Sequence, residues 1–150
     1  MKRPIIVWFL FFCLFFLGLG GLSGGSSMLI DPSGRSLGVA EALPLLPVPD
    51  FFLPGLFLLF VMGFLPLFLI YALWARLRWA WVEKIFRWSR YHWAWNLTLA
   101  LGLTLGAWLT WQGILIGFRE PVQWITAING LLIVLTGLSR PVREYFSASL

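Results

Sequence analysis

Charged side chains are scarce in this sequence. Asp, Glu, Lys and Arg make up 11% of its 150 residues, whereas hydrophobic residues make up 60%. An average soluble domain holds roughly a quarter charged residues, so a surface built from this chain could not be covered mainly by solvated groups. The composition predicts a single integral membrane domain and argues against a soluble protein.

Cysteine and histidine each occur once, as Cys13 and His92. A lone cysteine excludes an intrachain disulfide and a cysteine-rich metal site, and Cys13 within an apolar run is expected to be a packed side chain. We interpret His92 as an interfacial residue; the alternative, an axial ligand to haem or a chlorophyll-like pigment, would need a second ligand from elsewhere. The chain also lacks a glycine-rich phosphate loop followed by lysine. We therefore expect no cofactor, no metal and no enzyme active site.

Long apolar runs are what the sequence does have. A helix needs about 20 apolar residues to cross roughly 30 Å of hydrocarbon, and four runs of this kind contain no Asp, Glu, Lys or Arg. Ionisable groups inside a membrane usually mark proton or ion paths, so their absence argues against a proton-coupled pump. The first run follows Lys2 and Arg3 as a signal peptide would, but its length and the lack of an Ala-x-Ala site favour a retained span. The predicted spans cover about residues 5–22, 51–74, 93–116 and 122–138.

The basic residues fall mainly on one side of these spans. Nine lie in segments on the side of both termini and only Arg35 and Arg119 lie on the other, so the positive-inside rule predicts cytoplasmic termini. Most acidic residues are external in this topology, which separates them from His92 and argues against a Ser, His and acid triad. The nine basic residues are Lys2, Arg3, Arg76, Arg78, Lys84, Arg87, Arg90, Arg140 and Arg143.

The segment 75–92 interleaves cations with tryptophan. At helical spacing its apolar residues share one face, which predicts an interfacial helix. Dense tryptophans and clustered cations both favour the lipid headgroup level, so we expect this segment to anchor the chain to anionic lipid. Nucleic acid is the alternative partner of a basic aromatic segment, and the tryptophan belt argues against it. The apolar face holds Leu77, Trp81, Ile85, Trp88 and His92, and the candidate anchor residues are Arg76, Arg78, Lys84, Arg87 and Arg90.

Prolines and turn residues shape the segments around the second span. The tetrapeptide Asp31-Pro32-Ser33-Gly34 has the residue order of a type I turn. We expect this turn to bring the apolar segment 37–46 back onto the external membrane surface as a short interfacial helix over the mouth of the bundle. Inside the second span, Pro66 predicts a kink.

The third span carries glycines at small-xxx-small spacing, which favours close helix packing. A short connector makes the third and fourth spans antiparallel neighbours, so we expect these glycines to face the fourth span. Self-association with a second copy is the alternative. The candidate packing residues are Gly102, Gly106, Gly113 and Gly117.

Neutral polar residues also lie in or beside the last two spans. They are expected mainly to form interhelical hydrogen bonds, which contribute about 0.6 kcal/mol each on average. The alternative is a small polar pocket built from Gln112, Gln123 and Asn129.

Several short motifs resemble a widespread group of small bacterial four-span membrane proteins, a group whose members are uncharacterised. The Asp31-Pro32-Ser33-Gly34 turn followed by Leu37-Gly38 is the most specific of them. The others are Pro54-Gly55, Trp111-Gln112 with Leu115-Ile116-Gly117, and Val122-Gln123. The basic segment 75–92 is longer and more aromatic than this group leads us to expect. The resemblance implies a four-span architecture in a bacterial inner membrane, and it supplies no activity.

Together these patterns predict an all-α membrane protein with four transmembrane helices in a bundle, both termini in the cytoplasm, and an interfacial segment in the first external loop. We expect a non-catalytic accessory or scaffolding subunit that contacts anionic lipid and other membrane subunits. The alternative is a small transporter or channel-like homo-oligomer with a neutral polar path; a membrane enzyme ranks third. A wet cavity at the bilayer midplane would favour the alternative, and a dry interior would favour the accessory role.

Overall fold

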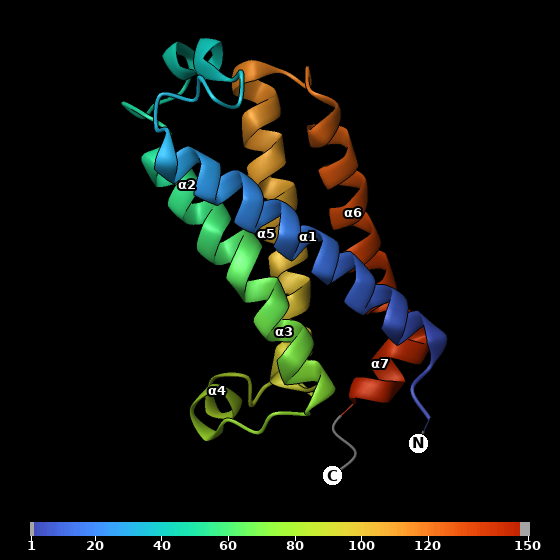
Figure 1. Ribbon diagram of the computed structural model, residues 1–150. Coiled ribbons are helices and arrows are strands. Elements are labelled where there is room, and N and C mark those ends of the chain that lie inside the picture. The colour runs from blue at the N-terminus through green and yellow to red at the C-terminus, as the bar shows by residue number, and fades with distance from the viewer. Residues whose placement is uncertain (1, 148–150) are drawn as a thin grey trace.

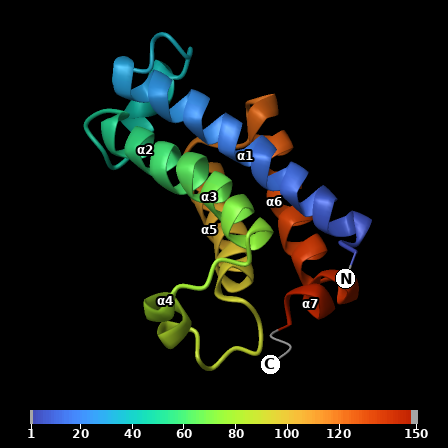
Figure 2. The same cartoon turned by 60° about the horizontal axis from the view of Figure 1, so that its bottom comes forward.

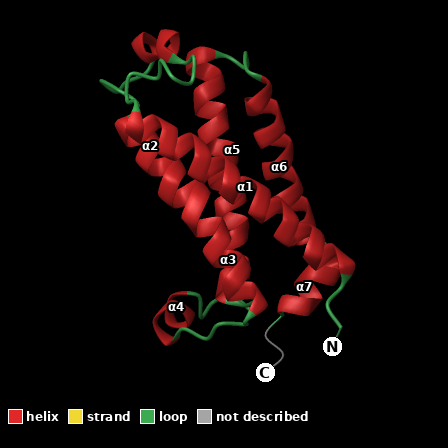
Figure 3. Cartoon of the chain, viewed as in Figure 1, coloured by secondary structure: helices red, strands yellow, loops and turns green. Residues whose placement is uncertain are grey.

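The computed structural model describes residues 2–147, which fold into helices joined by loops, without a strand in that range (Figures 1 and 3). Four helical segments are long and apolar enough to cross a membrane, namely Ile5–Ile30, Phe52–Trp74, Trp93–Ile116 and Pro121–Leu138. The prediction of an all-helical protein with four candidate spans is confirmed. The elements are α1 (Ile5–Ile30), η1 (Ala40–Leu45), α2 (Phe52–Phe57), η2 (Leu58–Phe64), α3 (Leu65–Trp74), α4 (Ala80–Ile85), α5 (Trp93–Ile116), α6 (Pro121–Leu138) and α7 (Arg140–Phe146).

Helix α1 ends at Ile30, well beyond the predicted end near residue 22. The extra turns contain serines and glycines, which have poor helix propensity in isolation. They are held by packing: a Cβ added at Gly25 would lie 2.5 Å from the backbone nitrogen of Leu59. Tertiary contact with the second span therefore extends the helix past the point where the apolar pattern weakens.

The second span is continuous but irregular. It runs through α2, η2 and α3, and η2 is a π-helical stretch in which the Leu65 N–H bonds to the Phe60 carbonyl. Pro66 follows at once, has no N–H to donate, and its ring would clash with the carbonyl four residues earlier in a regular helix. The wider π-helical turn lies where that clash would occur. The irregularity expected from Pro66 thus takes the form of a π-helix on its N-terminal side.

Two pairs of helices make up the bundle (Figure 1). Helix α1 packs along α2, η2 and α3, α5 packs along α6, and α1 also crosses α6. The four-residue connector between α5 and α6 makes those helices antiparallel neighbours, as predicted. Side chains from all four candidate spans meet at the centre, including the fully buried Leu10, Leu14, Met62, Leu69, Leu105 and Ile133.

The short elements lie at the two ends of the bundle. Figures 1 and 2 show α4 and α7 at the same end as both chain termini, with η1 and the α5–α6 connector at the other. The predicted helix over the whole of 75–92 is wrong, because only Ala80–Ile85 is helical there. Arg76 has a left-handed backbone, with φ of 48°, which ends the helical path after Trp74. In the other loop, 37–46 contains the six-residue 3-10 helix η1, which packs against α5.

Candidate functional site at the basic end of the bundle

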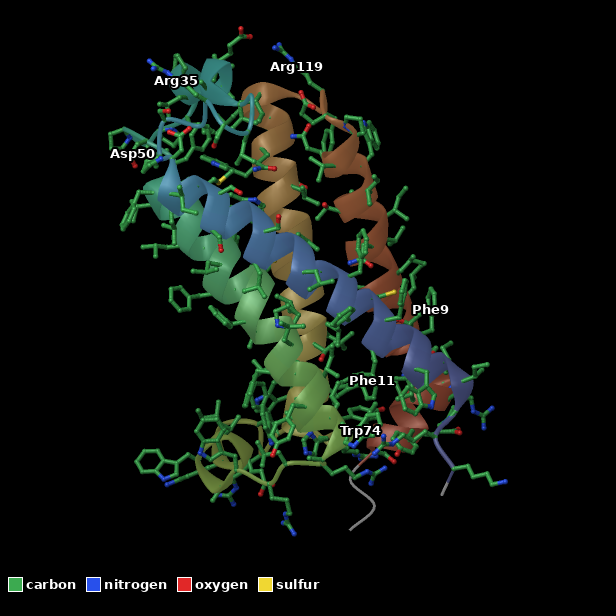
Figure 4. The ribbon with its side chains drawn as sticks, in the orientation of Figure 1. Phe9, Phe11, Arg35, Asp50, Trp74 and Arg119 are labelled. Atoms are coloured by element: carbon green, nitrogen blue, oxygen red, sulfur yellow. The ribbon has the colours of Figure 1, made fainter. Side chains whose placement is uncertain are left out.

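Charge divides the molecule into two unequal ends. The end with α4, α7 and both termini, called the basic end here, holds the nine Lys and Arg residues named above and two acidic residues, Glu83 and Glu144, a net charge of +7. The opposite end holds Arg35 and Arg119 with four acidic residues, a net charge of −2. Figure 4 shows Arg35, Asp50 and Arg119 far from Trp74, which lies at the basic end.

Arg3 connects three segments at the basic end. Its Nε donates to the Tyr145 hydroxyl of α7 at 3.2 Å, and a terminal nitrogen donates to the Trp74 carbonyl at the end of α3 at 2.8 Å. Its guanidinium carbon lies 4.1 Å from the centroid of the Trp74 ring, a cation–π distance. The Trp8 ring meets Trp74 edge-on at 5.1 Å. The start of α1, the end of α3 and α7 are thereby tied together.

Arg76 has a structural role as well. A terminal nitrogen donates to the Tyr145 carbonyl at 2.7 Å, and the guanidinium lies 4.6 Å from the Tyr145 ring centroid. Arg78 pairs with Glu83 at 3.5 Å on the exposed surface. Lys84, Arg87 and Arg90 are exposed and form no ion pair within residues 2–147. Of the five predicted anchor residues, these last three present uncommitted charge.

His92 uses both ring nitrogens inside the chain. Its Nδ1 accepts from the Ala94 N–H at 3.2 Å, which caps α5, and its Nε2 lies 3.1 Å from the Leu77 carbonyl oxygen. Both bonds fit the neutral tautomer with hydrogen on Nε2. The same carbonyl accepts from the Trp93 indole at 2.8 Å. This arrangement leaves His92 no free nitrogen for the haem or pigment considered above.

Burial lowers the pKa of His92 below its ordinary value of 6.5, and the Leu77 carbonyl offsets part of that effect. The neutral imidazole is therefore the favoured form at neutral pH.

Helix α7 is fixed to the start of α5. The His92 N–H donates to the Phe146 carbonyl at 2.9 Å, and Tyr91 and Ser147 form an isolated antiparallel bridge. Val142 and Phe146, two residues of α7, are buried against the bundle. A shallow notch of about 220 Å³ opens beside this junction, lined by Tyr91, Arg140, Arg143, Glu144 and Ser147.

The predicted polar pocket is not assembled by hydrogen bonds. The Gln123 side chain accepts from the backbone N–H groups of Arg119 and Glu120, at 2.9 and 3.1 Å, and so caps α6. Asn129 instead donates to the Cys13 carbonyl of α1 at 3.1 Å. The Gln112 side chain is half-buried and forms no hydrogen bond with the described residues. Two of the three amides are thus used in separate structural bonds.

The four predicted packing glycines have four different surroundings. A Cβ at Gly102 would meet Val134 of α6 at 2.6 Å, as expected of a contact with the fourth span. A Cβ at Gly106 would meet nothing within 4 Å, and one at Gly113 would strike Phe118 in the connector. Gly117 ends α5 with φ of 76°, a conformation that favours glycine. The expectation that all four face the fourth span is therefore wrong for three of them.

The closest helix approach involves glycines that sequence reasoning left out. Gly18, Gly21 and Gly25 lie along one side of α1, and a Cβ at Gly21 would strike the Met62 carbonyl group of η2. The partner span contributes Gly55 and Gly63 at the same contact. The spacing of three and four residues is a usable sequence signal. Gly18 and Gly21 lie inside the predicted span 5–22, but Gly25 lies beyond its predicted end.

Polar groups inside the described part of the chain are accounted for. Every buried side-chain nitrogen or oxygen of residues 2–147 has a hydrogen-bond partner. Within the same residues, no group of three or more His, Cys, Asp or Glu side chains is placed to hold a metal ion. The resemblance to small bacterial four-span proteins stays a prediction. Comparison with protein-family models, curated proteins and solved structures gives no match.

Proposed function

We propose that this chain is a non-catalytic accessory or scaffolding protein of a bacterial inner membrane that acts as a subunit of a larger membrane complex. The observation that carries the proposal is the use of its buried polar groups. Thr98 and Thr136 bond to carbonyls of their own helices, and Asn129 bonds across to α1. Because these groups are buried inside one bundle and each donates a hydrogen bond within it, we do not expect them to line a path for an ion or polar solute.

The basic end supports a role at the anionic leaflet. Its net charge is +7, whereas the net charge of the opposite end is −2. Each cation near an anionic surface contributes about 1 kcal/mol of attraction. Trp81 and Trp88 are 83% and 78% exposed, beside the uncommitted cations Lys84, Arg87 and Arg90. Exposed indole rings next to cations suit the headgroup region of a cytoplasmic leaflet.

A channel-like homo-oligomer remains the second candidate because of one feature of α5. Its exposed side carries Gly106, Ala107 and Thr110, whereas α1 and α6 expose mainly large apolar side chains. Small residues let helices from two copies approach closely. A pore formed between copies would not need the buried groups of one chain.

Two measurements on the full chain separate these roles. The first is gentle purification from its native membrane after in-cell crosslinking, with quantification of partners relative to this chain. We expect one or more membrane proteins at a fixed ratio; recovery of this chain alone, or only of copies of itself, would count against the accessory role. The second is ion and water flux in proteoliposomes of known protein content, where we expect no flux above empty vesicles. Flux that scales with protein and is lost in Thr110→Leu would support the channel instead.

A further inference from the structure

The notch beside α7 is made from one face of that short helix. Arg143, Glu144 and Ser147 lie three, four and seven residues after Arg140, so the four residues share a side, while Val142 and Phe146 are buried on the other. Tyr91 closes the notch from the start of α5. The Tyr91–Ser147 bridge and the bond from His92 to Phe146 hold the two walls at a fixed separation.

The charges in the notch leave donors available. The Nε of Arg140 donates a hydrogen bond to the Glu144 carboxylate at 2.6 Å, and this pairing raises the pKa of the Arg140 guanidinium. A guanidinium has five N–H donors, so the terminal nitrogens of Arg140 stay open. Arg143 forms no ion pair or side-chain hydrogen bond with residues 2–147. The notch therefore holds two guanidiniums against one carboxylate, beside the half-buried Tyr91 with its hydroxyl.

Its position along the bundle decides what can reach it. Helix α6 ends at Leu138, and Arg140 follows two residues later. Lipid phosphates lie where apolar spans end. Arginine forks match phosphate oxygens in charge and geometry, and often bind two of them at once.

We propose that this notch binds the phosphoryl group of an anionic lipid headgroup, with Arg143 and the open side of Arg140 as the phosphate ligands and Tyr91 as a hydroxyl donor. Glu144 is a positioning residue that orients Arg140. The inference deepens the proposed function and rests on its placement of the basic end at an anionic leaflet. It differs from the charge attraction of segment 75–92 in requiring one defined site.

Calorimetric titration of the purified full chain in neutral detergent tests this site. The probes are dioctanoyl phosphatidylglycerol, dioctanoyl phosphatidylcholine and inorganic phosphate. The variants are Arg143→Gln and Tyr91→Phe, with Arg87→Gln as the matched control, since it removes the same charge from an exposed position at the same end. Thermal unfolding of each variant checks that α7 stays docked through Val142 and Phe146, which none of the changes touches.

We expect saturable binding of phosphatidylglycerol at one site. Arg143→Gln should weaken it about tenfold, the loss expected for one charged hydrogen-bonding partner, and Arg87→Gln less than about twofold. Tyr91→Phe should give an intermediate loss. Phosphatidylcholine and inorganic phosphate should bind more weakly than phosphatidylglycerol.

Three results would overturn the proposal. Equal losses in Arg143→Gln and Arg87→Gln would mean diffuse attraction without a site. Absence of saturable phosphatidylglycerol binding would mean that the notch does not bind an anionic lipid. Inorganic phosphate binding as tightly as the lipid would make the occupant a soluble phosphate. None of these results bears on partner recovery or flux, so the proposed accessory role stands or falls separately.

Discussion

His92 illustrates how one side chain can make the basic end sensitive to pH. Its Nδ1 accepts the Ala94 N–H only when it carries no proton, and its Nε2 bonds to the Leu77 carbonyl that also holds Trp93. Protonation of His92 would therefore break the hydrogen bond from the Ala94 N–H that caps α5, and it would place a positive charge in a half-buried position. The imidazole thus couples the start of α5 to the segment that leaves α3.

The sign of the pH effect follows from the lowered pKa. Because the folded chain binds this proton less readily than the unfolded chain, the contribution of His92 is complete above about pH 6.5 and is lost as pH falls below it. We expect the unfolding temperature in detergent to fall between about pH 7.5 and about pH 5.5. His92→Asn keeps a capping acceptor without the titration and should show a flatter profile. Equal pH profiles for the two proteins would contradict this role.

Asp31 titrates at a lower pH than His92, so it does not contribute to the pH dependence expected from His92. Its carboxylate accepts from Ser33 and Ser36, and these hydrogen bonds lower its pKa from 3.8 to about 2. Its contribution to stability is therefore present above about pH 3.8 and lost as pH falls toward 2. We expect Asp31→Asn to leave the profile between about pH 5.5 and about pH 7.5 unchanged, as measured by the same unfolding experiment. A change of slope in that range would contradict it.

At the scale of whole elements, the contact of α1 with η2 sets the spacing of the first two spans. Gly21 meets the backbone of Met62, which cannot move aside as a side chain can. Gly102 meets a methyl group of Val134, a stiff β-branched side chain that must shift but is less fixed than backbone, and Gly106 meets nothing within 4 Å. The three positions therefore form a graded series within one protein.

We expect alanine at these glycines to follow that order. Gly21→Ala should destabilise the fold by about 1–3 kcal/mol, the usual cost of overpacking. Gly102→Ala should destabilise the fold by less than Gly21→Ala, because Val134 must shift but the gain in helix propensity offsets part of the cost, and Gly106→Ala should stabilise by about 0.5–1 kcal/mol. Reversible unfolding in mixed micelles measures all three. A loss at Gly106 as large as that at Gly21 would indicate that α5 packs against another copy.

The helices differ in how far their sequences predict them. The spans from Phe52 to Trp74, from Trp93 to Ile116 and from Pro121 to Leu138 lie close to their predicted bounds, because apolar length sets them and polar residues or glycine follow their ends. Segment 75–92 has a helical pattern over its full length, but only Ala80–Ile85 forms a helix. The Arg76 side chain bonds to the Tyr145 carbonyl, and the side chains of His92 and Trp93 bond to the Leu77 carbonyl. These contacts hold the rest of the segment in a non-helical path. Such long-range partners leave no local signal in the sequence.

The candidate site was predictable in charge but not in geometry. Counting cations identifies the basic end and the exposed Lys84, Arg87 and Arg90. It cannot show that Arg76 bonds to Tyr145 or that Arg140 and Arg143 line a notch with Tyr91, because α7 reaches Tyr91 only through the tertiary fold. The separation of Gln123 from Asn129 likewise depends on which neighbour each amide meets.

For the whole molecule, the unequal charge of the two ends predicts one orientation in the membrane. With nine cations at one end and two at the other, we expect reporter fusions after Arg90 and after Leu150, which lies outside the described residues, to report cytoplasm. A fusion after Ser36 should report the opposite side. Changing Arg78, Lys84, Arg87 and Arg90 together to Gln should produce a mixed orientation, while the same change at Arg35 should not. A cytoplasmic signal after Ser36 in the unchanged chain would contradict this topology.

The bonds of Arg3 also fix an order of events during synthesis. Arg3 leaves the ribosome well before Tyr145, its partner in α7, which lies 142 positions later. Until α7 has been made, Arg3 can bond to the Trp74 carbonyl but not to the Tyr145 hydroxyl. Closure of this link therefore follows the synthesis of α7, and it joins the first and last described helices at the basic end.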